Sequence, residues 1–159
     1  MNIILSRNLS IVQRTVLAVG CGAQAIIDPY RYDCVAYAAE ATTPPCALSK
    51  LADKMKNTEE GRLILKDKPN IHSSEIDLEY LANLEDNLFG KEYFKMLEQY
   101  SISPDTRVPV KFIDGETNEF IMRRFRQCHD LLHLLLQAPT TFEGEAYVKA
   151  YEFHQVIIH

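Results

Sequence analysis

The amino-acid sequence predicts an all-α fold, and three observations support this prediction. Apolar residues recur at helical spacing in several segments, capping residues precede these segments, and no segment shows sustained period-two alternation. The expected fold is a compact multi-helix domain in which a long helix is followed by an antiparallel partner helix. The length suffices for one substantial core, so we expect residues 1–159 to form a single domain.

The first helix is predicted to begin at Ser10 and to end near Asp28-Pro29. Ser10 and Gln13 form a capping-box pattern before an apolar run, and proline disfavours a helical residue before it. Thr43-Pro44 has the pattern of a cap followed by a first-turn proline. The helix expected behind it has one apolar face, formed by Leu48, Leu51, Ala52 and Met55.

Two further helices are expected before a loop. Thr58 can cap a short helix through Leu65, and another helix is predicted over residues 88–100. The apolar side of that second helix consists of Phe89, Tyr93, Met96, Leu97 and Tyr100. Residues 101–115 contain two prolines and a glycine, which predicts a loop with at most a short extended piece.

The longest helix is predicted over residues 116–137, before Pro139. Its expected buried stripe steps by four and three residues along Ile121, Phe125, Cys128, Leu132 and Leu135. Thr140 and Glu143 offer a second capping box, which predicts a last helix. The residues expected to face inward on this last helix are Ala146, Ala150, Phe153 and Ile157.

The composition narrows the class of protein. Apolar residues make up 47% and charged residues 25%, a globular balance that argues against disorder. The net charge of -5 predicts no nucleic-acid partner, because such proteins usually carry a basic excess. The four cysteines never approach C-x-x-C spacing and follow no secretory signal, so we expect reduced thiols.

The amino-terminal segment has an unusual charge pattern. Residues 1–27 contain Arg7 and Arg14 but no acidic residue, as mitochondrial targeting segments do. Its apolar part, residues 15–27, is shorter than the roughly 20 residues that span a bilayer, so no transmembrane helix is predicted. Two interpretations stay open, an interfacial or docked helix and a first helix buried in the core.

Two histidines and two acids are predicted to converge around the end of the longest helix. His129 and His133 lie four residues apart on one helix face, and Asp130 falls within the same arc. Glu145 follows in the first turn of the next helix, which an antiparallel pair brings back beside them. Two imidazoles with one or two carboxylates suit zinc, or non-haem iron and manganese.

A histidine pair at this spacing is by itself a weak indication of a metal site. Two histidines and an aspartate among the leucines of residues 131–136 are costly to bury unless they are paired or coordinated. The residues alone therefore leave two interpretations. One is a metal site, and the other is a polar cluster in which Asp130 pairs with Arg126 and the histidines bond to the backbone.

The motif His129-Asp130-x-x-His133, followed after eleven residues by Glu145, resembles the HDxxH-x11-E signature of one family. That family is the fourth Coq protein of ubiquinone (coenzyme Q) biosynthesis, a peripheral protein on the matrix side of the mitochondrial inner membrane. Five more segments are similar to family motifs in the same order: 28–33 (DPYRYD), 40–43 (EATT), 90–93 (GKEY), 103–107 (SPDTR) and 124–126 (RFR).

The resemblance implies a divalent ion bound by His129, Asp130, His133 and Glu145, with zinc favoured and iron, manganese or magnesium as alternatives. It also implies an apolar cavity for an isoprenoid tail and a role as organiser of the ubiquinone biosynthetic assembly. Assistance in oxidative decarboxylation at ring carbon one belongs to the same expectation, which leaves open whether the chain is an enzyme or purely structural. The implied partners are other ubiquinone-biosynthesis proteins, a prenyl lipid or quinone, and the inner-membrane surface.

Arg124 and Arg126 lie about one turn before His129. They are candidates for holding a carboxylate or a lipid phosphate, and the alternative is that they are solvated or structurally paired arginines.

Two features depart from the family pattern. Gln137 stands where the family has glycine, and we expect it either to narrow the site or to lie in solvent. The sequence ends at His159, whereas typical relatives continue through helices that help to enclose the lipid pocket, so an apolar flank is expected to need a partner, a second copy or a membrane. The alternative function is a non-catalytic accessory subunit of a respiratory complex, with complex I (NADH:ubiquinone oxidoreductase) as host.

Overall fold

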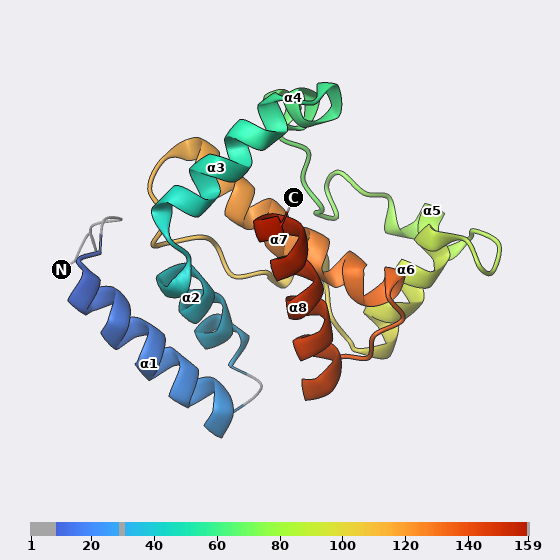
Figure 1. Ribbon diagram of the computed structural model, residues 1–159. Helices are drawn as coiled ribbons and strands as arrows, with labels where there is room; N and C mark the ends of the chain where they lie inside the picture. The colour runs from blue at the N-terminus through green and yellow to red at the C-terminus, as the bar shows by residue number, and fades with distance from the viewer. Residues whose placement is uncertain (1–8, 29–30, 159) are drawn as a thin grey trace. The chain divides into compact units, whose positions relative to one another are not determined.

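The computed structural model describes residues 9–28 and 31–158, without the side chains of residues 45, 142 and 155–158. The described residues form eight α-helices and one 3-10 turn and contain no strand, which confirms the predicted all-α class (Figure 1). The chain divides into two units, and each is described by itself. That residues 1–159 form a single domain stays a prediction.

The first unit consists of Met1–Lys68 and Val108–Arg123. Its helices are α1 (Ile11–Ile27), α2 (Tyr32–Thr42), α3 (Pro45–Lys56), α4 (Glu59–Asp67) and the first part of α7 (Glu116–Leu135). The predicted capping box opens α1, because the Gln13 amide donates to the Ser10 hydroxyl and the Ser10 amide donates to the Gln13 side chain. The prediction that α1 ends near Asp28 is also confirmed, whereas Pro29 lies outside the described residues.

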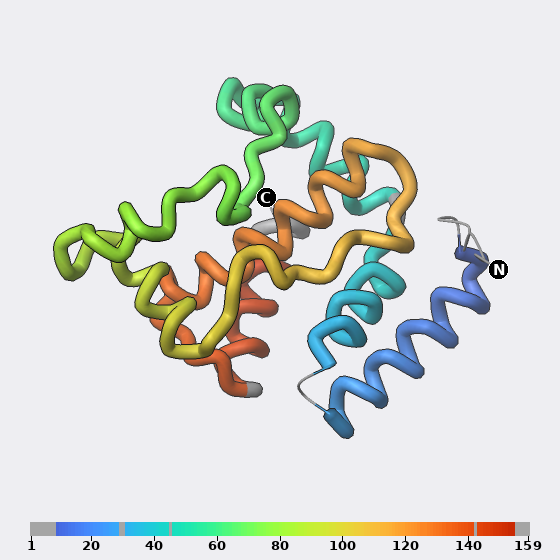
Figure 2. The backbone as a smooth tube through the Cα atoms, turned by 180° about the vertical axis from the view of Figure 1, so that it is seen from behind, coloured from blue at the N-terminus to red at the C-terminus, as the bar shows by residue number. Residues whose placement is uncertain are grey.

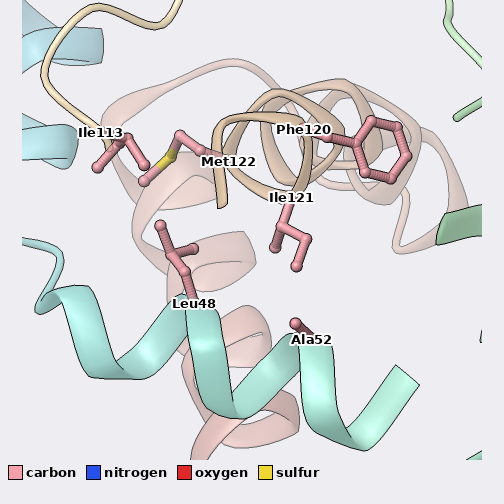
Figure 3. Close-up of a cluster of buried hydrophobic side chains, with 6 residues drawn as sticks. All are labelled: Leu48, Ala52, Ile113, Phe120, Ile121 and Met122. Carbon is pink, nitrogen blue, oxygen red and sulfur yellow. The ribbon is translucent and has the colours of Figure 1, made fainter. Parts of the chain in front are cut away.

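A buried hydrophobic cluster between α3 and α7 forms the core of the first unit (Figure 3). Leu48 and Ala52 project from α3 toward Ile121 and Met122, and this confirms the apolar face predicted for α3. The buried members of the cluster are Leu48, Ala52, Ile113, Phe120, Ile121 and Met122.

A fully buried carboxylate fixes the loop before α7 to the end of α2. Glu40 accepts hydrogen bonds from the backbone amides of Lys111 at 3.0 Å and Phe112 at 2.6 Å. Buried backbone donors that find no acceptor are costly, so Glu40 satisfies two amides at once and holds the loop in place.

Helix α1 packs beside α2, and both views of the chain show the two helices side by side (Figures 1 and 2). None of the described α1 side chains is buried, so the interpretation of α1 as a buried core helix is wrong. Within the described residues, no helix combines the length and the apolar character needed to cross a membrane.

The second unit consists of Pro69–Arg107 and Arg124–His159. It contains α5 (Leu78–Ala82), α6 (Phe89–Gln99), the 3-10 turn η1 (Pro104–Thr106), the remainder of α7 and α8 (Phe142–Ile158). Its core cluster is formed by Ile71, Tyr93, Met96 and Leu97, against which Leu131 and Leu134 of α7 pack. The apolar side predicted for α6 is thus confirmed at the centre of the helix. Phe89 and Tyr100, at the two ends of the helix, are exposed instead.

The face of α8 that points inward differs from the prediction. Ala146, Ala150 and Phe153 are exposed, and Val148 and Glu152 are buried instead. The reason is that α8 turns its acidic residues toward the histidines of α7. The inward face of α8 is therefore set by contacts between acids and histidines and not by the apolar pattern. The side chain of Ile157 lies outside the described residues. Leu135 of the expected α7 stripe is also exposed.

Gln137, two residues after the end of α7, adopts a left-handed backbone conformation with φ of 51°. The next amide, that of Ala138, donates back to the His133 carbonyl at 2.9 Å, as at many helix ends that use glycine in this position. The Gln137 side chain is exposed, so of the two expectations for it the structure favours solvent.

We expect Gln137→Gly to stabilise the chain by about 1 kcal/mol, because glycine adopts the left-handed region without the strain of a side chain. Urea unfolding followed by circular dichroism measures the change. The matched variant Gln137→Ala keeps a Cβ at this position and is expected to give no comparable gain.

Candidate metal centre

The two histidines and Glu145 converge at the carboxyl-terminal half of α7 and the first turn of α8, within the second unit. The Nε2 atoms of His129 and His133 lie 3.2 Å apart. One carboxylate oxygen of Glu145 lies 3.0 Å from Nε2 of His129, and the other lies 3.1 Å from Nε2 of His133. The three ligand atoms lie within 4.8 Å of one another.

The antiparallel course of α7 and α8 produces this convergence. His133 contacts Glu145, while His129, one turn earlier on α7, also reaches Glu152, two turns later on α8. The later histidine of α7 thus meets the earlier acid of α8, and the earlier histidine meets the later acid, as two antiparallel helices require. This confirms the predicted antiparallel partner helix, and Figure 1 shows α8 running back beside α7.

A close approach of backbone at the start of α8 positions Glu145. The helix is capped by Thr141, and not by the predicted Thr140, because the Thr141 hydroxyl accepts from the Gly144 amide at 3.3 Å. A Cβ atom at Gly144 would lie 1.8 Å from the Pro139 carbonyl oxygen, so only glycine fits. Glu145 therefore follows a turn whose path is fixed sterically.

The Nδ1 atom of each histidine already faces an acceptor. Nδ1 of His129 lies 3.0 Å from an oxygen of Glu152, and Nδ1 of His133 lies 3.1 Å from the Ala138 carbonyl oxygen. A hydrogen on Nδ1 satisfies both contacts, and it leaves the lone pair on Nε2, which points into the cluster. Metal-bound histidines are commonly oriented in this way by an acceptor on the other ring nitrogen.

The charges around His129 favour a cation. Burial disfavours the charged imidazole, but the hydrogen bonds to Glu145 and Glu152 outweigh this effect and raise the pKa of His129 to about 9. The hydrogen bond from His129 likewise lowers the pKa of Glu145 below its ordinary value. Two carboxylates thus face the ring, and the cluster attracts either a proton or a metal ion.

The donor set and its spacing fit a divalent ion. Zinc–nitrogen and zinc–oxygen bonds of about 2.0–2.1 Å in a tetrahedron place the ligand atoms about 3.3 Å apart. The Nε2–Nε2 distance of 3.2 Å is close to this spacing, and each Nε2 atom lies 3.0 or 3.1 Å from a different oxygen of Glu145. His133 is 4% exposed and Glu145 46%, so the cluster is closed on the histidine side and open beside Glu145.

Asp130, the fourth predicted ligand, is not part of this group. Its Oδ2 atom accepts from Nε of Arg107 at 3.0 Å and also from Nη2 of the same guanidinium. Arg107 further donates to the carbonyl oxygens of Ile71 and Pro104, each at 2.9 Å. Arg107 is thus a partner that the structure shows for Asp130, and the alternative pairing of Asp130 with Arg126 stays a prediction.

Arg124 and Arg126 are both half-buried on α7, at the beginning of the second unit's share of this helix. The Nε atom of Arg126 is buried without a hydrogen-bond acceptor, although the side chain has other interactions. The role of these arginines toward a carboxylate or a phosphate stays a prediction.

Three residues that shape the site were missed by sequence reasoning. Glu152 contacts His129, Lys149 donates to Glu152 at 3.0 Å, and Arg107 holds Asp130. Lys149 also lies over the ring of Phe125 at 5.4 Å. The spacing of seven residues between Glu145 and Glu152 places both acids on one helix face and is the signal that could have identified Glu152.

Comparison with known proteins places these residues in a family context. The family model described as "Coenzyme Q (ubiquinone) biosynthesis protein Coq4" matches residues 6–159. The chain is 46% identical to the mitochondrial ubiquinone biosynthesis protein COQ4 homolog of Danio rerio, over 92% of this chain and 54% of that protein. It is 41% identical to the mitochondrial ubiquinone biosynthesis protein COQ4 of Podospora anserina, over 94% of this chain and 50% of that protein.

The homolog from Xenopus tropicalis is 43% identical over 89% of this chain and 50% of its own length. The chain therefore spans about half the length of the curated relatives it matches. No solved structure matches the chain.

Proposed function

The chain belongs to the coenzyme Q (ubiquinone) biosynthesis protein Coq4 family, and from this premise we propose that it acts in mitochondrial ubiquinone biosynthesis as a metal-binding protein. The observation that carries the metal part is the convergence of both Nε2 atoms on the Glu145 carboxylate while both Nδ1 atoms face acceptors. The relatives' names support the pathway and the compartment.

His129, His133 and Glu145 would hold the ion, and Asp130 would join them only by leaving Arg107. Zinc is our first choice, because two histidines with one carboxylate and an open position form the donor set of catalytic zinc sites. Iron, manganese and magnesium are the alternatives. Such an ion, when bound, supplies Lewis-acid polarisation of a carboxylate or carbonyl oxygen.

The open edge at Glu145 is where a substrate would approach. Burial keeps water from the two histidine rings, and Glu152 together with Lys149 keeps the ring of His129 in one orientation. From the family resemblance we further propose that the chain lies at the matrix side of the inner membrane. There it would help to organise the biosynthetic assembly and assist oxidative decarboxylation at ring carbon one.

The direct test is metal analysis of the purified 159-residue chain after dialysis against metal-free buffer. We expect close to one zinc ion per chain, measured by inductively coupled plasma mass spectrometry. A chain that refolds fully, keeps all three ligands and yet takes up none of the four candidate ions when each is added would contradict the proposal.

The biological test uses cells whose own protein is replaced by the double variant His133→Ala/Glu145→Ala. We expect ubiquinone to fall while the variant protein persists, and the wild-type protein to migrate with biosynthetic enzymes on native gels. Normal ubiquinone together with a loss of complex I assembly would instead favour the accessory-subunit alternative.

Glu152 gives a sharper test of how the site is built. We expect Glu152→Gln to weaken zinc binding by about 10–100-fold, because outer carboxylates orient the metal-bound histidine and raise its basicity. A competition titration with a chromophoric chelator measures the change. The control is Glu143→Gln, which removes an exposed acid from the first turn of the same helix and is expected to leave the affinity unchanged.

A further inference from the structure

Two cysteines face each other where α1 packs beside α2. The Cys21 thiol of α1 and the Cys34 thiol of α2 are hydrogen-bonded to each other, and both are free thiols. Cys34 is buried, whereas Cys21 is half-buried and can be reached from solvent. Two thiols in contact can be joined covalently without a rearrangement of the helices that carry them.

The register of the two helices accounts for this contact independently. The helices run in opposite directions and lie side by side (Figures 1 and 2). Arg14 of α1 donates to the carbonyl oxygens of Glu40 at 3.4 Å and Thr43 at 3.2 Å, at the end of α2. Cys21 lies two helical turns after Arg14, and Cys34 lies about two turns before Glu40 and Thr43. An antiparallel pair aligned at Arg14 therefore brings the two cysteines to the same level.

Small side chains allow the helices to approach closely at this level. Ala18 and Gly22 are half-buried on α1 beside Cys21, and on α2 Ala38 is half-buried one turn after Cys34. Packed helices lie about 8–10 Å apart and their Cα atoms lie about 2.3 Å from each axis, so facing Cα atoms are roughly 3.5–5.5 Å apart. This range overlaps the separation of about 4.4–6.8 Å that a disulfide requires between its Cα atoms.

The other chemistry open to a thiol pair is metal binding, which needs further ligands. Within the described ranges, 9–28 and 31–158, the one group of side chains that could hold an ion consists of His129, His133 and Glu145. A thiol pair without further ligands is suited to oxidation, because two thiols in contact can exchange with an external disulfide in two successive steps.

We propose that Cys21 and Cys34 are a site of reversible oxidation, at which glutathione disulfide or a similar small disulfide converts the two thiols into a bond between α1 and α2. The bond would close a loop over residues 21–34, so α1 could not separate from α2 while the pair is oxidised. The inference goes beyond the proposed function, because it involves neither the metal ligands nor the ubiquinone pathway.

The reaction proceeds by two exchanges. The more accessible Cys21 loses its proton and attacks one sulfur of glutathione disulfide, which forms a mixed disulfide and releases one glutathione as the thiol. Cys34 then loses its proton and attacks the Cys21 sulfur, and the second glutathione leaves as the thiol. Two cysteine thiols are oxidised, and one glutathione disulfide is reduced to two glutathione thiols.

The surroundings of Cys21 make this exchange slow. Burial raises the pKa of Cys21 above its ordinary value, and the Cys34 thiol and the Asp33 carboxylate add to this effect, while Arg31 opposes it. The thiolate is the attacking form, so little of the reactive species is present at neutral pH. The pair is therefore suited to a bond set by the ratio of disulfide to thiol around it, and not to a rapid response to peroxide.

The test incubates the purified 159-residue chain with glutathione disulfide and glutathione in varied ratio, in the presence of a metal chelator. Free thiols are then blocked with N-ethylmaleimide, and peptide mass spectrometry locates each bond. In the oxidising mixtures we expect the Cys21–Cys34 bond to exceed the mixed disulfide on Cys21 by about tenfold or more, because the second thiol is already in contact. Cys46, which is exposed on α3, is expected to carry glutathione.

Two variants isolate the contribution of the pair. Cys34→Ala removes the second thiol, and the reaction is expected to stop at the mixed disulfide on Cys21. Cys21→Ala/Ala23→Cys moves the thiol to an exposed position about 200° round α1, where we expect glutathione to be added and no bond to Cys34 to form. Circular dichroism checks the fold of both variants, and the result on the unaltered chain does not depend on either.

Hydrogen exchange adds a structural measurement. We expect amides of α1 to exchange about tenfold more slowly in the oxidised chain than in the reduced chain, because the bond opposes separation of the two helices, while amides of α4 exchange at unchanged rates.

Two results would overturn the proposal. One is that Cys21 and Cys34 both stay reduced in mixtures that modify Cys46, which would make the pair a packing contact only. The other is that Cys21→Ala/Ala23→Cys forms the bond to Cys34 as readily as the unaltered chain, which would mean that the register of α1 and α2 plays no part.

Discussion

Glu145→Gln is expected to lower the zinc affinity of the chain about a thousandfold. The change keeps the size of the side chain but removes the charge that faces both Nε2 atoms. Structural zinc sites contribute about 10–16 kcal/mol in total, so one of three protein ligands accounts for roughly a third of that. Competition against a chelator of known affinity measures the loss.

Glu143→Gln is the matched control, because it lies two residues earlier in the same first turn and is exposed. His133→Asn removes a second ligand and is expected to have a comparable effect, with its fold checked by circular dichroism. Zinc binding that tolerates both ligand changes would mean that the ion lies elsewhere. The two histidines and Glu145 would then form a polar cluster that binds no ion.

Arg107→Ala is expected to destabilise the chain by about 3 kcal/mol. The guanidinium links four groups, because it donates to Asp130, to the carbonyl oxygens of Ile71 and Pro104, and to the Tyr93 hydroxyl. Its removal leaves a partly buried carboxylate and two carbonyls without their donor. Urea unfolding monitored by circular dichroism measures the free energy of unfolding.

The comparison variant is Arg31→Ala, which removes an arginine whose pair with Asp33 is exposed, and its midpoint is expected to change little. An Arg107→Ala midpoint equal to that of Arg31→Ala would contradict the structural role assigned to Arg107.

Asp130→Asn tests what the second residue of the HDxxH motif does. Because Asp130 is held by Arg107, we expect this variant to lower stability while changing zinc affinity less than tenfold. A loss of affinity equal to that of Glu145→Gln would instead make Asp130 a ligand, as the family motif implies.

Local signals in the sequence identified most helices. Ser10 and Thr58 each use a side chain to cap the helix that follows, and both starts were predicted. Helix α2 was missed because Arg31 makes no side-chain cap before it and because its apolar residues follow one another almost without interruption, which hides the helical period. Helix α5 was missed because five residues are too few to establish a period. Capping residues and apolar periodicity are short-range signals, so they predict only the helices that have a cap or a clear apolar period.

The sequence predicted which residues come together at the site, but it did not predict all the contacts that hold them there. His129, His133 and Glu145 could be placed together by helix geometry, because the two helices are consecutive. The contacts of Glu152 with His129 and of Arg107 with Asp130 each join residues 23 positions apart, and no periodicity encodes such pairs. For the same reason the apolar pattern assigned the wrong inward face to α8, whose burial is set by Glu152.

All three ligand-capable residues belong to one hairpin, the end of α7 and the start of α8 joined by residues 136–141. An ion bound there would cross-link the two helices, so α8 could detach locally only after releasing it. Amide hydrogen exchange in α8 should therefore slow as zinc is added, while amides of α3 and α4 exchange at unchanged rates. The hairpin would thus act as its own cooperative folding segment, with an opening free energy set by zinc concentration.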